Sequence, residues 1–197
     1  MFVERGHPLS KLFLGLVHRR LYGDAQVCDV QIADYVSTLL TEFAHVKNLY
    51  RIRDARGKRL EDVGEMLIES NPLFEGRSFD REREVRKHIG DYTLFLAGLF
   101  PEYVACLPRR GLRLDSLIDY VKAGKESYRI VSFFDQFEYR DEAPLFRRLS
   151  EAFELCVWGL NLVKRDLERY QQVYYQSLWS ALSDQATPRR RGFATDE

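Results

Sequence analysis

His88 has the surroundings that a reactive histidine needs, in a segment whose apolar residues recur at helical spacing from about residue 78 to residue 100. Glu84 lies one helical turn before His88, and Asp91 follows three residues after it. His88 also falls close to the centre of the apolar stripe of this expected helix. A buried histidine beside a carboxylate can have a shifted pKa and can act in acid–base chemistry or in metal ligation. A histidine that only bonds a backbone carbonyl or a tyrosine hydroxyl is the alternative, and the sequence leaves both open.

Glycines interrupt the same expected helix at Gly90 and Gly98, and a later expected helix at Gly124. Each costs up to about 1 kcal/mol of helix stability relative to alanine. A tight helix crossing explains this cost, because glycine lets another backbone come close. Alternatively, the small residues leave room for a flat ligand among aromatic side chains, as in the apolar pockets found between helices. The candidate ligand-binding residues in that case are His88, Asp91, Tyr92, Tyr120 and Tyr128.

Metal chemistry finds little support in the sequence. A di-iron site in a helical bundle needs two Glu-x-x-His motifs and two further glutamates, all pointing inward. Glu42 and His45 form one such motif, but both lie away from the apolar stripe of their expected helix and should face solvent. A second motif, Glu4 with His7, runs into Pro8, which disfavours a helix there. Glycine-rich phosphate loops and the common hydrolase and zinc-protease motifs are also missing from the sequence. We therefore predict no metal site and no cofactor.

The three cysteines, Cys28, Cys106 and Cys156, are odd in number and widely spaced. This pattern argues against a disulfide framework or a zinc site and favours reduced, mostly buried thiols. The apolar run over residues 12–17 is too short for a signal segment or a membrane span, and no longer uncharged run follows. We expect a cytoplasmic protein with no transmembrane segment.

The composition is that of an ordinary globular domain. The chain has 197 residues, 45% of them hydrophobic, with 30 basic and 30 acidic side chains. A wholly disordered chain is excluded by this hydrophobic content, and the balanced charge disfavours general nucleic-acid binding. We expect residues 1–186 to form a single helical domain. Residues 187–197, which include Arg189–Arg191, are expected to form a mobile basic and polar tail.

Helical periodicity covers almost the whole chain, and no segment alternates as a strand would. The sequence therefore predicts an all-α fold, a compact bundle of five to seven helices whose short loops make successive helices antiparallel neighbours. The expected helices cover about residues 9–22, 29–50, 60–69, 78–100, 115–131 and 144–173, with a short extra turn over 101–107 and a continuation of the last helix toward residue 182.

The long C-terminal helix that begins near Pro144 carries apolar residues on two opposite sides. Leu155, Trp158 and Leu162 share the second side at spacings of three and four residues. A helix that is apolar on both sides must be covered on both sides. Either it is the central helix of the bundle, or its second side meets another chain.

Aromatic residues continue this segment, and Tyr174 and Trp179 stand among glutamines. Aromatic side chains with polar tips suit interfaces and pocket rims, although simple packing of a terminal helix on the bundle gives the same pattern. The candidate interface residues are Leu155, Trp158, Leu162, Tyr174 and Trp179.

No catalytic motif emerges from these patterns. We expect a non-catalytic cytoplasmic interaction protein that self-associates as a homo-oligomer or joins a larger assembly through a protein partner. The alternative is a helical-bundle ligand-binding protein or enzyme with an apolar aromatic pocket around His88.

Overall fold

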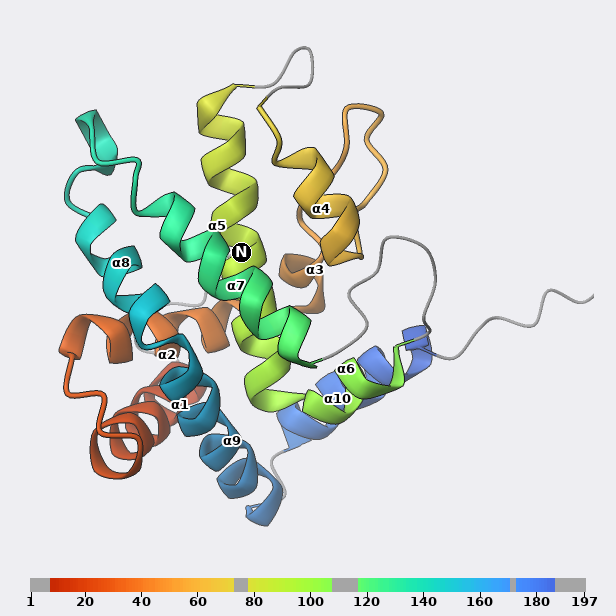
Figure 1. Cartoon of the computed structure of the whole chain (residues 1–197). Coiled ribbons are helices and arrows are strands. Elements are labelled where there is room, and N and C mark those ends of the chain that lie inside the picture. The colour runs from red at the N-terminus through yellow and green to blue at the C-terminus, as the bar shows by residue number, and fades with distance from the viewer. Residues whose placement is uncertain (1–7, 73–77, 108–116, 171–172, 187–197) are drawn as a thin grey trace, which may run out of the picture.

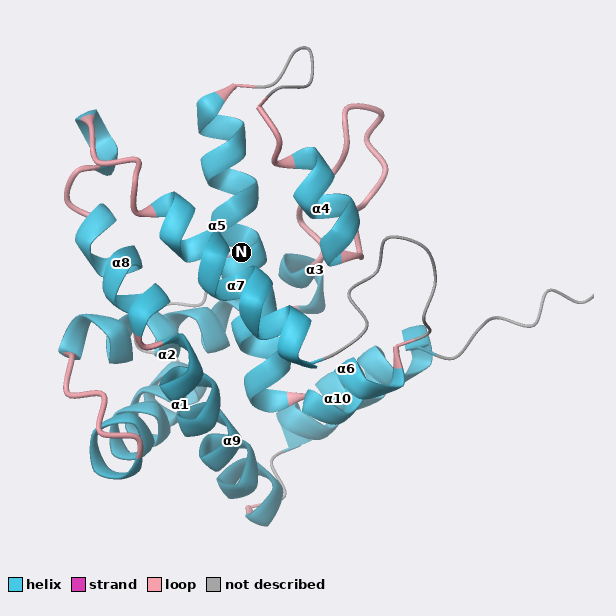
Figure 2. Ribbon diagram, viewed as in Figure 1, coloured by secondary structure: helices cyan, strands magenta, loops and turns pink. Residues whose placement is uncertain are grey.

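The computed structural model describes residues 8–72, 78–107, 117–170 and 173–186, and within these segments every regular element is a helix (Figure 2). One isolated β-bridge pairs Arg53 with Arg59, but no strand forms in the described segments. The predicted all-α class is confirmed. The elements are α1 (Pro8–His18), the π-helix η1 (Arg19–Asp24), α2 (Val30–Phe43), α3 (Val46–Leu49), α4 (Val63–Glu69), α5 (Phe79–Leu99), α6 (Pro101–Cys106), α7 (Leu117–Val131), the 3₁₀ helix η2 (Phe137–Tyr139), α8 (Ala143–Glu151), α9 (Phe153–Arg169) and α10 (Val173–Ala186).

The starts of two long helices follow from their capping residues. The Asp29 side chain accepts hydrogen bonds from the backbone N–H groups of Gln31 and Ile32 at the start of α2. The Ser78 hydroxyl accepts from the backbone N–H of Arg81 at the start of α5. Short polar side chains at these positions satisfy N–H groups that have no partner inside the helix. Both starts agree with the sequence prediction to within a residue.

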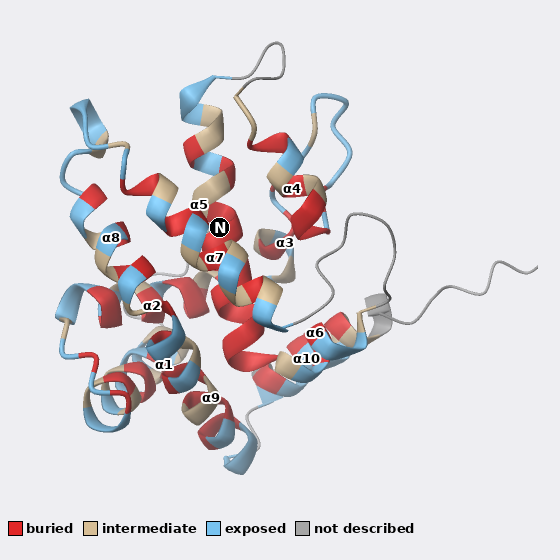
Figure 3. Cartoon of the chain, viewed as in Figure 1, coloured by how far each residue is buried: buried red, intermediate tan, exposed pale blue. Residues whose placement is uncertain are grey.

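The central helix of the fold is α5, which packs against α2, α4, α6, α7 and α9 (Figure 1). Every residue of α5 from His88 to Leu99 is buried (Figure 3). Asp91 is the only acid or base, apart from His88, in this twelve-residue stretch, so α5 can be surrounded by other helices at the cost of burying one carboxylate. The C-terminal segment, for which the sequence offers a central position as one of two alternatives, does not lie there.

That single long C-terminal helix is divided into α8, α9 and α10. The first break is at Ala152, with φ −95° and ψ 12°, and the second follows Arg169, with Tyr170 at φ −85° and ψ 6°. Neither break carries proline or glycine, which explains why the sequence gives no sign of them. With ten α-helices in the described residues, the predicted count of five to seven is also too low.

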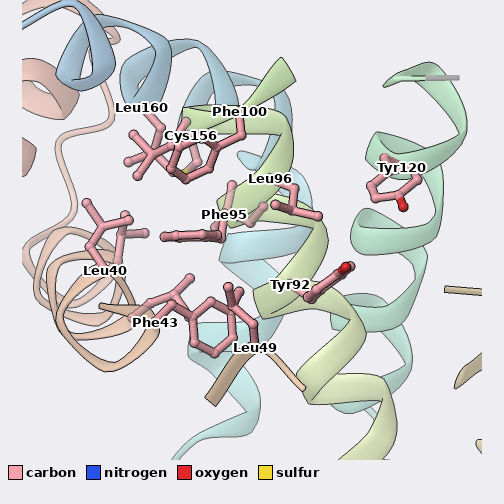
Figure 4. Close-up of a cluster of buried hydrophobic side chains, with 14 of the residues drawn as sticks. Leu40, Phe43, Leu49, Tyr92, Phe95, Leu96, Phe100, Tyr120, Cys156 and Leu160 are labelled. Carbon is pink, nitrogen blue, oxygen red and sulfur yellow. The ribbon is translucent and has the colours of Figure 1, made fainter. Parts of the chain in front are cut away.

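The main apolar core lies where α2, α5 and α9 meet. Phe95 of α5 packs edge-on against Phe43 of α2, with ring centroids 5.3 Å apart. Figure 4 shows these rings together with Leu160 and Cys156 of α9, on the other side of α5 from Tyr120. All of these side chains are buried, so α9 contributes one full face to the core.

The prediction of mostly buried thiols holds for one cysteine of three. Cys156 is buried, but Cys28 and Cys106 are exposed, so the expectation of mostly buried thiols is wrong for two of the three. All three are free of disulfides.

Among the described residues, no helix has the length and apolar character needed to cross a bilayer. The predicted tail, residues 187–197, lies outside the described residues.

Candidate functional site

Asp91 is the centre of a buried polar cluster in which α2, α5 and α7 meet. Its Oδ1 accepts hydrogen bonds from the Tyr35 hydroxyl at 2.5 Å and from the Tyr128 hydroxyl at 2.8 Å. Its Oδ2 accepts from the Nζ of Lys87, one turn earlier on α5, at 3.1 Å and lies 3.8 Å from the Arg51 guanidinium. We call these five residues the Asp91 cluster.

The Asp91 residue is only 2% exposed, yet its carboxyl group is held in the ionised form. Burial alone raises the pKa of a carboxyl group, but Lys87, the two hydroxyl donors and Arg51 together outweigh burial and lower the pKa of Asp91 below its usual value. Burial, followed by the Asp91 charge, raises the pKa of Tyr35 and of Tyr128 well above the usual range. Both hydroxyls therefore stay protonated, and the acceptor sites of the carboxylate are filled by the chain's own donors.

His88 lies on a neighbouring face of α5 and is fully buried. Its Nε2 donates a hydrogen bond to the backbone oxygen of Leu49 at 3.0 Å, and its ring packs against Phe43 with centroids 5.8 Å apart. Burial, followed by the positive charge of Arg51, lowers the pKa of His88 to about 3. The ring is therefore neutral. Its Nε2 bonds a backbone carbonyl, whereas its buried Nδ1 has no hydrogen-bond partner among the described residues.

The five candidate ligand-binding residues do not converge on one site. Asp91 and Tyr128 belong to the Asp91 cluster. The ring of Tyr92 instead lies 6.0 Å from that of His88, and Figure 4 shows Tyr120 of α7 on the side of α5 where Tyr92 projects. Consecutive residues of a helix point about 100° apart, whereas residues four apart share a face. The side chains of Asp91 and Tyr92 therefore point in different directions. Asp91 and Tyr128 form one group of candidates, and His88, Tyr92 and Tyr120 lie elsewhere.

The space beside Gly90 and Gly124 is filled by the chain's own side chains. A Cβ atom added at Gly90 would lie 2.4 Å from the ring of Tyr128. One added at Gly124 would lie 2.2 Å from the hydroxyl of Thr93 and 2.3 Å from the ring of Phe153. Glycine thus lets α5 and α7 cross closely, in agreement with the tight-crossing explanation, and no room for a flat ligand remains beside either glycine.

A surface hollow of about 330 Å³ adjoins the Asp91 cluster at Tyr35. Two of the carboxylates in its lining already have partners within the chain. Asp34 pairs with His18 at 2.8 Å, and Glu142 pairs with Arg83 at 2.7 Å. In addition, no group of three or more histidines, cysteines and acids in the described segments has a geometry that suits a metal ion.

Sequence reasoning missed Tyr35, Lys87 and Arg51 as members of the Asp91 cluster. Lys87 was detectable, because a lysine four residues before an aspartate on one helix is a recognised ion-pair spacing. Tyr35 is 56 residues from Asp91 along the chain, so only the packing of α2 on α5 brings the two together.

The outer side of α9 presents apolar side chains to solvent. Leu155 is 48% exposed and Trp158 is 50% exposed, while Leu162, one turn further on, is partly exposed. We call these three residues the outer face of α9. Of the two alternatives for this helix, a central position covered on both sides does not hold, because α5 occupies the centre and α9 lies at the edge of the bundle (Figure 1). Contact with another chain stays a prediction.

One flank of α9, next to the outer face, is attached to η1. The Arg20 guanidinium on η1 donates to both oxygens of Asp166, at 2.7 Å and 2.6 Å. Leu21, the next residue of η1, packs so closely on Gly159 that a Cβ atom there would lie 2.5 Å from it. The π-helix thus supplies both a bidentate ion pair and a close apolar contact to α9, beside its outer face.

The aromatic segment of α10 folds back on the end of α5. Tyr175 and Trp179 both stack near Phe100, with ring centroids 5.2 Å and 6.0 Å from it, and Trp179 keeps 37% of its surface exposed. Tyr174 is in α10, but its side chain lies outside the described part of the chain. Of the candidate interface residues Tyr174 and Trp179, Trp179 therefore has part of its surface covered by contacts within its own chain.

Exposed phenylalanines form a second apolar feature. Phe79, Phe133 and Phe137 are all largely exposed, and Phe137 is 90% exposed with a backbone φ of 51°, a left-handed value that bulky residues rarely adopt. These rings come from three different elements. The outer face of α9 differs from them, because its residues follow one stripe of one helix and include a tryptophan.

Comparison of the chain with models of known protein families, with curated proteins and with solved structures finds no match. The geometry described above is therefore the basis on which its function is argued.

Proposed function

We propose that the chain is a non-catalytic protein-interaction domain that binds its partner through the outer face of α9. The observation that carries this proposal is the half-exposed Trp158 beside the half-exposed Leu155, on a helix that the Arg20–Asp166 ion pair ties to η1 along its flank. Single exposed apolar residues are common, but a continuous apolar stripe marks an interaction site more often. Tryptophan is also among the residues that contribute most to binding at the centre of interfaces.

The buried polar groups support a non-catalytic role. Asp91 has its oxygens occupied by donors of its own chain, and His88 is sealed in the core with a pKa of about 3. A general acid or base must reach a substrate within hydrogen-bond distance. Neither group is open to one, so both support the fold instead. The free cysteines fit the reducing conditions of a cytoplasmic location.

The proposal is tested by placing a photo-reactive amino acid at position 158. We expect p-benzoylphenylalanine in place of Trp158 to form covalent protein adducts on illumination of cells that produce the chain, because the position lies inside the interface. The readout is the adduct band on a denaturing gel, detected through a tag on the chain.

The matched control carries the same amino acid in place of Arg56, an exposed residue of a loop distant from α9 in the sequence. Equal adduct yields at the two positions, or none at position 158, would contradict the proposal. Trp158→Ser should leave the far-ultraviolet circular dichroism unchanged, since the side chain is half exposed, and this shows that the position tolerates replacement.

A further inference from the structure

We infer that the occupant of the outer face of α9 is a helical segment of another protein, with acidic residues next to its own apolar stripe. This inference rests on the proposed function, because it gives the chemistry of the partner for the same face. It follows from the charges that border the outer face and from which of these charges already have partners within the chain.

Two arginines extend the stripe of the outer face toward the C-terminal end of α9. Leu155, Trp158 and Leu162 are three and then four residues apart, and the same alternation continues to Arg165 and Arg169. All five residues lie within α9, so they share one face of a single helix. Arg165 and Arg169 are exposed. The stripe is therefore apolar in its first part and basic in its last part.

A third arginine lies beside the basic part of the stripe. Arg19, on η1, is exposed and directly precedes Arg20, which donates to both oxygens of Asp166 on α9. Hydrogen bonding to Arg20 is the main cause that lowers the pKa of Asp166, and burial opposes it. The charges of Arg19 and Arg169 also lower this pKa, so both arginines lie near the carboxylate. We call Arg19, Arg165 and Arg169 the arginine group.

The arginine group has no partner in the part of the chain that the structure describes. None of its three guanidinium groups forms a hydrogen bond or an ion pair there. The acidic residues of α9, in contrast, all have basic partners within the chain: Lys125 for Glu154, Arg20 for Asp166 and Lys164 for Glu168. The unpaired charge beside the outer face is therefore positive.

Stabilisation of the helix end does not account for this charge. A cation in the last turn of a helix interacts favourably with the helix dipole. Only Arg169 belongs to the last turn of α9, whereas Arg165 precedes it and Arg19 belongs to η1. The arginine group is thus left with a charge that a partner can use.

These charges favour a different protein over a second copy of the chain. A second α9 packed on the outer face would bring its own Arg165 and Arg169 to the interface, and no carboxylate of α9 is free to pair with them. Opposite charges select partners at interfaces, and like charges placed together are unfavourable. Acidic side chains of another protein meet this requirement.

The direction of α9 also sets the direction of the partner helix. Arg165 and Arg169 lie toward the C-terminal end of α9. Acidic residues are most favourable in the first turn of a helix, at the positive end of its dipole. A partner helix that runs antiparallel to α9 therefore places an acidic first turn beside the two arginines and its apolar residues beside Trp158.

Three synthetic helical peptides of equal length test the charge and the direction. Each carries three leucines at heptad spacing; two glutamates precede the leucines in the first peptide and follow them in the second, and two lysines precede them in the third. Fluorescence anisotropy of the labelled peptides gives their dissociation constants for the full chain. We expect the first peptide to bind about tenfold more tightly than the second and about a hundredfold more tightly than the third.

Charge reversal in the chain should reverse this preference. The double variant Arg165→Glu/Arg169→Glu should bind the first peptide at least about tenfold more weakly and should bind the third more tightly, because repulsion and attraction are exchanged. The matched control, Arg56→Glu/Arg59→Glu, changes two exposed arginines outside α9 and should leave all three affinities unchanged. Circular dichroism of both variants checks that the fold is kept.

The photo-crosslinking experiment at position 158 provides the second test. Combined with Arg165→Glu/Arg169→Glu, the photo-reactive residue should form much less adduct. Mass spectrometry of the adduct formed by the original chain should identify a segment in which acidic residues precede apolar ones.

Several outcomes would overturn the inference. Equal affinities for the first and third peptides, or no binding of the first peptide up to about 500 µM, would show that the arginine group does not select an acidic partner. Tighter binding of the second peptide than of the first would contradict the antiparallel direction. If the adduct persists in the charge-reversed variant, or contains a second copy of the chain, this inference fails while the proposed function stands. If position 158 forms no adduct in any variant, both fail.

Discussion

The Asp91 cluster and the outer face of α9 depart in opposite directions from the usual distribution of side chains. In the first, a carboxylate, an ammonium group and two hydroxyls meet at the centre of the bundle; in the second, a tryptophan and two leucines stand in solvent. The buried Asp91 cluster is explained within the chain, because both carboxylate oxygens of Asp91 have partners there. The apolar side chains on the outer face of α9 have no comparable set of contacts within the chain. The comparison supports the proposal that the chain binds its partner through the outer face of α9, because that face is the one left without comparable contacts inside the chain.

The largest effect should come from removing the interior charge. We expect Asp91→Asn to lower the free energy of unfolding by about 3 kcal/mol, because Lys87 and Arg51 lose their counter-charge and the tyrosine hydroxyls lose a charged acceptor. Urea denaturation followed by circular dichroism measures the change.

Asp34→Asn is the matched control for this variant, since it removes an exposed carboxylate that is paired with His18. It should change the free energy of unfolding by less than about 1 kcal/mol. An equally small change for Asp91→Asn would show that the Asp91 cluster does not stabilise the interior.

The next largest effect should come from the close crossing that brings Tyr128 to Asp91. Gly124→Ala should destabilise the fold by about 2 kcal/mol, because the new methyl group meets Thr93 and Phe153. Gly15→Ala, in α1, has open space around the new methyl group and should stabilise the fold by about 0.5–1 kcal/mol through helix propensity. Thermal unfolding measures the stability of the two variants. A Gly124→Ala variant that is more stable than the original chain would mean that the crossing has room for a methyl group.

The smallest effect, measured over a single pH unit, should be a pH dependence set by His88. Its pKa is about 3 in the folded chain and about 6.5 when unfolded. Below pH 6.5 the unfolded chain binds a proton at His88 that the folded chain does not, so stability is full above pH 6.5 and falls as the pH drops toward 3. Between pH 6 and 5 the slope should be about 1 kcal/mol per pH unit.

His88→Gln should remove this slope, whereas His45→Gln, at an exposed position, should keep it. The measurement is urea denaturation at several pH values, and the slope is the readout because the absolute stability of either variant can differ. A slope that survives in His88→Gln would assign the pH dependence to other groups.

The fold was predictable from sequence as far as local signals reach. Periodicity identified the all-α class and placed the starts of α2 and α5 within a residue of Asp29 and Ser78, whose side chains cap these helices. The break at Ala152 was not predictable, because its residues all favour a helix and packing on neighbouring helices decides the geometry. The central position of α5 was recoverable in principle, since twelve consecutive residues there carry one acid and one histidine.

The candidate site was predictable to a smaller degree. Asp91, Tyr128, Leu155 and Trp158 were identified from sequence, but the sequence grouped Asp91 with Tyr92, whose side chain points to another part of the core. Periodicity separates the covered side of α9 from its outer face, but it gives no sign of η1, the π-helix that packs beside Gly159. Long-range pairing, such as that of Tyr35 with Asp91, leaves no local trace in the sequence.

The close contacts at Gly90 and Gly124, together with the bonds to Asp91, fix the alignment of α7 on α5. Sliding α7 by one turn, about 5.4 Å, would carry the Tyr128 hydroxyl out of reach of the carboxylate and bring a bulkier residue to the place that Gly124 now fills. Either change alone is unfavourable, and a slide imposes both. The two helices therefore pack in a single register, and any slide between them would lose the hydrogen bond and create a steric clash at the same time.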